Sequence, residues 1–70
     1  MKKVKIPKGF IETRKKLPMY GKNIIIFLRD GESYRAMRVE TALAEQGYCY
    51  EDINMHDHDA ENVIAWKDGR

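Results

Sequence analysis

The strongest structural signal in this sequence is Asn23-Ile24-Ile25-Ile26-Phe27-Leu28-Arg29. Five consecutive apolar residues between turns are typical of a strand that is buried on both faces, so the pattern predicts a central strand of a sheet. A turn precedes it at residues 20–23, and Asp30-Gly31 forms a second turn signal after it. We therefore expect the fold to be organised around a strand over residues 23–29.

A change of periodicity after the turn at residues 30–31 favours a helix. Ser33 is in the place of an N-cap, residues 36–46 are mostly good helix formers, and Gly47 stands where a C-terminal cap belongs. These signals predict a helix over about residues 34–46, with four residues on one stripe: Ala36, Val39, Glu40 and Leu43. The alternative is a hairpin in which residues 32–39 form a second strand, and the helix formers after Val39 favour the helix over it.

Two of the remaining segments are expected to be extended, and the third allows either a helix or a strand. Residues 48–55 alternate as a strand does. Residues 59–66 allow a short helix capped by Asp59 or a closing strand. Residues 1–21 predict an extended basic arm, because Pro7 and Pro18 remove backbone donors, and the segment between them allows a short edge strand.

These elements predict one α+β domain over residues 1–70, with the arm at 1–21 and a compact core at 22–70. Its sheet would have three to four strands with one main helix. The pairing of residues 23–29 with residues 48–55, parallel or antiparallel, stays open.

Charge is divided between the two ends of the chain although the net charge is only +2. Residues 1–22 contain eight basic residues against one acid, Glu12, whereas residues 39–66 contain seven acids and no lysine or arginine. Such asymmetry indicates recognition of a charged partner, or loose pairing of the two ends across the folded surface.

Catalytic and metal chemistry each lack a required residue. His56 and His58 could share a divalent ion with Glu51 or Asp57, but a structural zinc site needs four ligands. Cys49 lies in a predicted strand and is expected to be a small buried hydrophobe. No phosphate loop, nucleophile elbow or paired-carboxylate spacing is present, so we predict no enzyme activity, no metal and no cofactor.

About half of the chain resembles the β-α-β opening of glutaredoxins. The resemblance rests on residues 24–27, a helix over residues 33–46, Gly47, Tyr50 and residues 52–54. Where that family has a Cys-Pro-Tyr-Cys motif, this chain has Glu32-Ser33-Tyr34-Arg35, without a thiol. The resemblance therefore implies an inactive adaptor with parallel pairing of residues 23–29 and 48–55, and no thiol-disulfide exchange.

A second resemblance spans more of the chain. Leu17-Pro18 followed by Gly21-Lys22, an apolar strand, and Val63-Ile64-Ala65-Trp66 near the C-terminus are similar to small uncharacterised phage and prophage proteins. This resemblance implies an accessory role on a mobile element, with the tail as a strand.

The sequence thus predicts a small non-enzymatic accessory protein of phage type that binds and inhibits or modulates a host protein. A nucleic-acid-binding module that uses the basic arm and an inactive glutaredoxin-like adaptor are the alternatives. Twelve residues are candidates for binding: Lys2, Lys3, Lys5, Lys8, Arg14, Lys15, Lys16, Tyr20, Tyr34, Arg35, Tyr48 and Trp66. With one cysteine and no long apolar segment, we expect a cytoplasmic protein without a membrane partner, in the host cytoplasm if it is phage-encoded. An exposed edge strand could lead to a homodimer.

Overall fold

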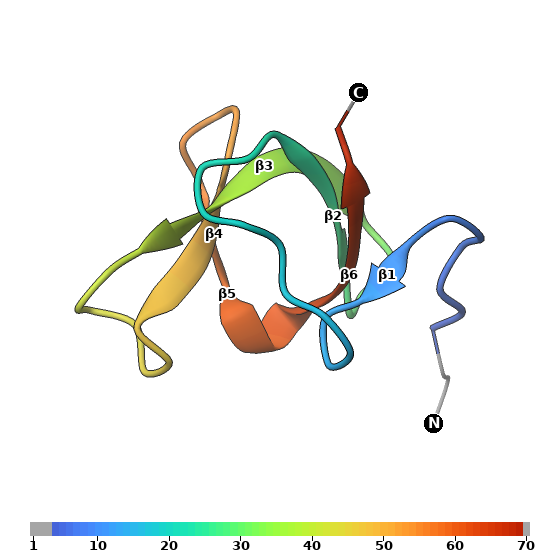
Figure 1. Ribbon diagram of the computed structural model, residues 1–70, viewed down its shortest axis with the longest axis horizontal. Coiled ribbons are helices and arrows are strands. Elements are labelled where there is room, and N and C mark those ends of the chain that lie inside the picture. The colour runs from blue at the N-terminus through green and yellow to red at the C-terminus, as the bar shows by residue number, and fades with distance from the viewer. Residues whose placement is uncertain (1–3, 70) are drawn as a thin grey trace.

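The computed structural model describes residues 4–69, which form a curled six-stranded antiparallel sheet and one turn of 3-10 helix (Figure 1). The strands are β1 (Ile11–Glu12), β2 (Ile24–Leu28), β3 (Ser33–Glu40), β4 (Tyr48–Asp52), β5 (Asp57–Asp59) and β6 (Val63–Asp68), with η1 (Ala60–Asn62) before β6. Their order in the sheet is β1-β6-β2-β3-β4-β5, so the predicted strand at residues 23–29 is present and lies inside the sheet.

The expected α+β class is wrong, because residues 33–40 form β3 in place of the predicted helix. The turn at residues 28–32 returns the chain along β2: Leu28 N–H donates to the Glu32 carbonyl at 2.8 Å, and Gly31 adopts a φ of +93°. Registers such as Ile24 opposite Ala36 then satisfy the backbone of both strands. The hairpin that was the alternative for this segment is therefore the observed structure.

The helix-forming residues after β3 lie in the turn between β3 and β4. Thr41 N–H donates to the Gly47 carbonyl at 3.0 Å, and Gly47 N–H donates to the Ala44 carbonyl at 3.0 Å. Leu43 is 97% exposed, so a helix here would have no apolar contact to stabilise it. A helix this short is marginal without such packing, which explains why local propensity fails. Gly47 does need the left-handed conformation, with a φ of +84°, but in a turn.

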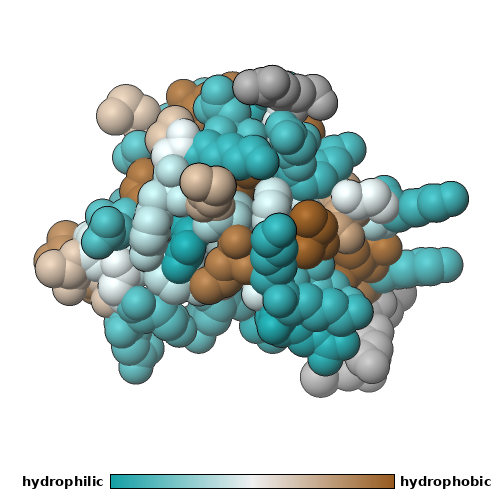
Figure 2. All heavy atoms as spheres, in the orientation of Figure 1, coloured by the Kyte–Doolittle hydropathy of each residue, from teal (hydrophilic) through white to brown (hydrophobic). Residues whose placement is uncertain are grey.

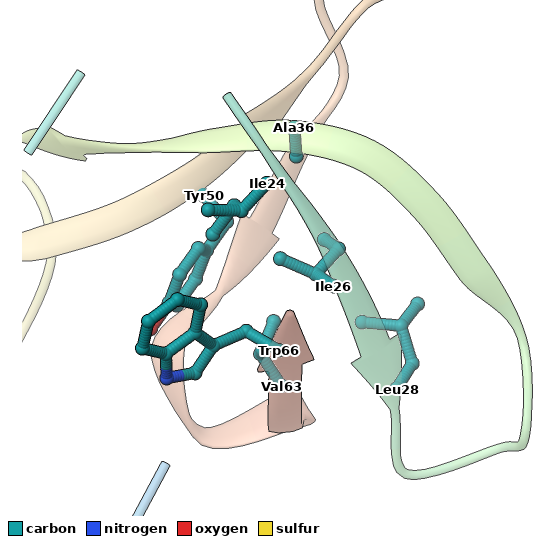
Figure 3. Packing of buried hydrophobic residues seen from close by; sticks show 7 residues of the cluster. All are labelled: Ile24, Ile26, Leu28, Ala36, Tyr50, Val63 and Trp66. Atoms are coloured by element: carbon teal, nitrogen blue, oxygen red, sulfur yellow. The ribbon is translucent and has the colours of Figure 1, made fainter. Parts of the chain in front are cut away.

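The core lies inside the curl of the sheet (Figure 3). Alternate residues of β2 point into it, and side chains from β3, β4 and β6 complete it: Ile24, Ile26, Leu28, Ala36, Tyr50, Val63 and Trp66. Trp66 is 5% exposed, and its Nε1–H donates to the Lys16 carbonyl at 2.8 Å. This bond ties the N-terminal segment to the core.

The remaining elements settle the questions that the sequence left open. β2 and β4 do not pair, because β3 lies between them, so the β-α-β arrangement implied by the glutaredoxin resemblance is not observed in residues 4–69. Residues 59–66 contain both a short 3-10 helix and a closing strand. Within the N-terminal segment, β1 pairs with β6, and Tyr20 bridges to Arg38 on β3. The described residues include no helix of the length and apolarity needed to cross a membrane.

Candidate functional site

A depression on the described part of the chain, here called the arm groove, has a volume of about 670 Å³. It lies between the N-terminal segment, the start of β4 and η1. Its lining includes four apolar or aromatic residues and two arginines: Ile6, Leu17, Tyr48, Ile64, Arg14 and Arg29. Glu12 and Glu61 also line it. An apolar lining with a few charged groups at its border is the usual composition of a binding site.

A stacked cation fixes one wall of the arm groove. The Arg38 guanidinium lies between two rings, 4.2 Å from the Tyr20 centroid and 4.0 Å from the Tyr48 centroid. Arg38 Nη1–H also donates to the Pro18 carbonyl at 3.0 Å, and Gly21 N–H donates to the Arg38 carbonyl at 2.9 Å. Cation–π contacts of this kind become stronger as the cation is desolvated. The cluster therefore attaches the arm to β3 and positions Tyr48 in the groove.

The single acid of the arm is neutralised locally. Glu12 accepts hydrogen bonds from Arg14 Nε at 2.8 Å and Lys15 Nζ at 3.1 Å. The Lys15 hydrogen bond, and then that of Arg14, lowers the pKa of the Glu12 carboxyl below its usual range. Among the described residues of the arm, no ion pair connects a basic side chain to an acid of residues 39–66.

In residues 4–69 the two charged ends approach each other without forming ion pairs between the arm and residues 39–66. β1 and β5 are the two edges of the sheet, but the arm also reaches β3 through the bridge from Tyr20 to Arg38, and Glu61 lines the arm groove together with Arg14. The acids of residues 39–66 lie on β3, β4, β5, η1 and the adjoining turn: Glu40, Glu45, Glu51, Asp52, Asp57, Asp59 and Glu61. Pairing of the chain ends is limited, within the described residues, to Lys22 Nζ and Asp68 Oδ2, which are 3.6 Å apart. Both charged surfaces remain available to a partner.

A second polar cluster surrounds the buried carboxylate of Asp52. Its Oδ1 accepts N–H groups of Asn54 at 2.9 Å and His56 at 3.0 Å, and its Oδ2 lies 2.8 Å from His58 Nε2. The bond from His58, followed by those two backbone bonds, lowers the pKa of Asp52 despite its burial. An ionised carboxylate only accepts hydrogen bonds, so His58 Nε2 is the donor.

The ring of His58 stacks on that of Tyr34, with centroids 4.9 Å apart. Both border a cavity of about 450 Å³, together with Leu28, Arg29, Asp30 and Asn62. A histidine that is held in one orientation can act as a base, but nucleophilic catalysis also needs a nucleophile beside it.

Thiol and metal chemistry find little support in the described residues. Cys49 is buried, and burial, reinforced by Asp57 and Glu51, raises the pKa of its thiol. A protonated thiol is a poor nucleophile. No three side chains of histidine, cysteine, aspartate or glutamate gather closely enough within residues 4–69 to hold a metal ion.

The candidate binding residues of the sequence fall into separate places. Lys2 and Lys3 lie outside the described residues, whereas the other four arm lysines are exposed: Lys5, Lys8, Lys15 and Lys16. Arg14 and Tyr48 meet at the arm groove, and Tyr20 stacks on the neighbouring Arg38.

The last three candidates lie elsewhere. Tyr34 borders the smaller cavity, Arg35 donates to the Gly69 carbonyl at 2.7 Å, and Trp66 is in the core. Sequence reasoning missed Arg38, because the predicted helix placed it away from Tyr48. In the structure Arg38 lies opposite Tyr50, two residue pairs from Tyr48.

No protein-family model, no curated protein and no solved structure matches this chain. Function is therefore inferred from the arm groove, the charge of the arm and the exposed apolar residues.

Proposed function

We propose that this protein is a small non-enzymatic binding module whose arm groove holds an acidic segment of another protein. If the chain is phage-encoded, that protein belongs to the host, and binding inhibits or modulates it. The observation that carries the proposal is the arm itself, whose basic residues are not neutralised by the acids of residues 39–66. Unneutralised charge beside an apolar groove attracts an oppositely charged partner and selects against like-charged ones.

The arm groove offers both components that protein recognition needs. Leu17 is 40% exposed, and it lines the groove with the ring of Tyr48, which Arg38 holds in place. Rigid aromatic and aliphatic anchors supply most of the binding energy in protein interfaces. Lys16, which is exposed and precedes the lining residue Leu17 in the chain, contributes mainly to the rate of encounter and to selectivity. An acidic segment with one or two apolar side chains fits this combination.

The test is affinity capture from host lysate with the wild-type protein and a groove variant, K16E/L17S. Both side chains are exposed, so the change should preserve the fold. L43S is the matched control, because Leu43 is 97% exposed and does not line the groove. We expect wild type and L43S to retain one partner in stoichiometric amount, and the groove variant to retain about tenfold less or lower.

The same capture is repeated after nuclease treatment and over a range of salt concentrations. Survival of the complex after nuclease treatment supports a protein partner. Two results would overturn the proposal: equal capture by the groove variant, or capture that nuclease abolishes. The second result would favour the nucleic-acid alternative, for which the logarithm of affinity falls linearly with the logarithm of salt concentration.

A further inference from the structure

The turn between β4 and β5 presents two large apolar side chains to solvent. Ile53 is 70% exposed and Met55 is 76% exposed, and together they are called the tip. Hydrophobic residues also reach the surface elsewhere, among them Leu43 and Met19, and in the face drawn in Figure 2 they lie in patches among hydrophilic ones. Two neighbouring side chains with this exposure gain nothing from the fold, so the turn that displays them needs an explanation.

The buried carboxylate of Asp52 holds the tip in one conformation. Asp52 is 5% exposed and binds the N–H groups of Asn54 and His56, which follow Ile53 and Met55 in the chain. Met55 has a φ of +64°, a conformation that residues other than glycine, asparagine and aspartate rarely adopt. A buried carboxylate must keep its hydrogen bonds, so the turn cannot readily relax. The tip is therefore preorganised, with both side chains outward.

The surroundings of the tip are acidic. Glu51 on β4 lies directly opposite Asp57 on β5, and Asp59 is the neighbouring exposed acid on the same short strand. None of these three carboxylates has a lysine or arginine partner within residues 4–69. Like charges in register repel, and a partner with basic groups would relieve that repulsion. The chemistry that fits the tip is thus an apolar groove with a basic border.

The arm groove has this chemistry: Leu17 and Tyr48 line it together with Arg14 and Arg29. The exposed Lys15 and Lys16 stand in the chain between the lining residues Arg14 and Leu17, so the basic groups of this border outnumber the two acids of the lining, Glu12 and Glu61. One chain cannot close the contact on itself. Figure 1 shows the β4–β5 turn on the opposite side of the molecule from η1 and the loop after β1, which border the groove.

We propose that the tip of one copy docks into the arm groove of a second copy, so that the protein associates head to tail. The inference rests on the groove of the proposed function and names a second occupant for it. A heterologous contact of this type leaves a free tip and a free groove at the two ends, so further copies can add.

The test is sedimentation velocity of the purified full chain over a concentration series at low and physiological salt. We expect wild type to form dimers and longer species as concentration rises, more so at low salt because the surface charges are then less screened. The tip variant I53S/M55S and the groove variant K16E/L17S should each remain monomeric. L43S, which changes an apolar residue 97% exposed elsewhere, should associate as wild type does.

Mixing the two variants provides the decisive measurement. The tip variant retains a groove and the groove variant retains a tip, so an equimolar mixture should form a 1:1 dimer that grows no further. In a two-fold symmetric dimer both contacts would close at once, so wild type that stops at the dimer would overturn the head-to-tail contact. Wild type that stays monomeric, a mixture that stays monomeric, or L43S that also loses association would each overturn the proposal.

Capture from lysate separates this inference from the proposed function. The tip variant should capture the acidic partner at least as well as wild type, because its groove is intact and no second copy competes for it. Self-association without capture would refute the proposed function alone, and capture without self-association would refute the head-to-tail contact alone.

Discussion

The substitution Tyr50→Phe removes one oxygen from the centre of the core and should stabilise the protein. Tyr50 has no exposed surface, and its hydroxyl has no hydrogen-bond partner among the described residues. A buried hydroxyl left without a partner costs about 1–3 kcal/mol. The phenylalanine ring keeps the edge-on contact with Tyr48, whose centroid is 6.0 Å away. We expect the free energy of unfolding to rise by about 1 kcal/mol and the melting temperature by roughly 4–8 °C.

Alkaline pH should increase the difference in free energy of unfolding between Tyr50→Phe and wild type. Burial, followed by the effect of Tyr48, raises the pKa of Tyr50 from 10.0 to about 12. In the unfolded chain the phenol loses its proton near pH 10, whereas in the folded protein it keeps the proton until about pH 12. The contribution of Tyr50 to stability is therefore complete below pH 10 and falls as pH rises toward 12, by about 3 kcal/mol over the whole interval. The phenylalanine variant lacks this loss.

The assay is urea unfolding followed by the fluorescence of the single tryptophan, Trp66, at pH 7 and at intervals from pH 9 to 11. Tyr48→Phe is the control, because Tyr48 is only partly buried and its ring contact with Arg38 would remain. The control should change the free energy of unfolding by no more than about 0.5 kcal/mol. A loss of 1 kcal/mol or more in Tyr50→Phe at pH 7 would refute the reasoning, since it would mean that the hydroxyl is hydrogen-bonded.

Three further predictions concern stability. Ile26→Ala should lower the free energy of unfolding by about 2–5 kcal/mol in urea, because Ile26 has no exposed surface; a loss below 1 kcal/mol would contradict the core assignment. Arg38→Lys should lower it by about 1 kcal/mol, because a lysine lacks the planar, delocalised guanidinium that contacts the rings of Tyr20 and Tyr48; an unchanged urea midpoint would contradict that role. In Asp52→Asn, the free energy of unfolding should fall less steeply than in wild type as the pH drops below about 4. The folded state lowers the Asp52 pKa from 3.8, so in wild type this contribution is lost as pH falls through the lowered pKa; an identical acid limb would refute it.

Local patterns succeeded where one segment carries enough information by itself. The apolar run at residues 24–28 is buried in any arrangement of neighbours, so its strand and its inner position were predictable. The alternation over residues 48–55 predicted β4, although the strand ends at Asp52 and the chain turns after it. Gly47 was expected to take a left-handed conformation and does so, although the element that it ends is a strand-connecting turn.

The predicted helix failed because two local signals compete in residues 33–46. The second half has high helix propensity, whereas the first half forms β3, in which Ala36 is buried in the core. Pairing of β3 with both β2 and β4 supplies hydrogen bonds and burial that an isolated helix lacks. That gain depends on residues far away in the sequence, so propensity within the segment cannot reveal it.

The same reason limited the prediction of the site. The charge of the arm was evident in the sequence, but the cation held between Tyr20 and Tyr48 requires the 18–21 segment, β3 and β4 to meet. The buried bond between Asp52 and His58 was also unforeseen, because His58 follows a turn whose geometry Asp52 itself sets. Trp66 was a binding candidate by type, and its position in the core follows only from the pairing of β6 with β2.

The sequence by itself determined the central strand, the turn at Gly31 and the division of charge, because each depends on residues that are neighbours in the chain. The tertiary structure alone decided that residues 33–40 are a strand, that the charged ends do not neutralise each other, and that the tip and the arm groove lie on opposite sides. These outcomes depend on pairing between distant strands, whose hydrogen bonds and burial outweigh the modest preferences of any single segment.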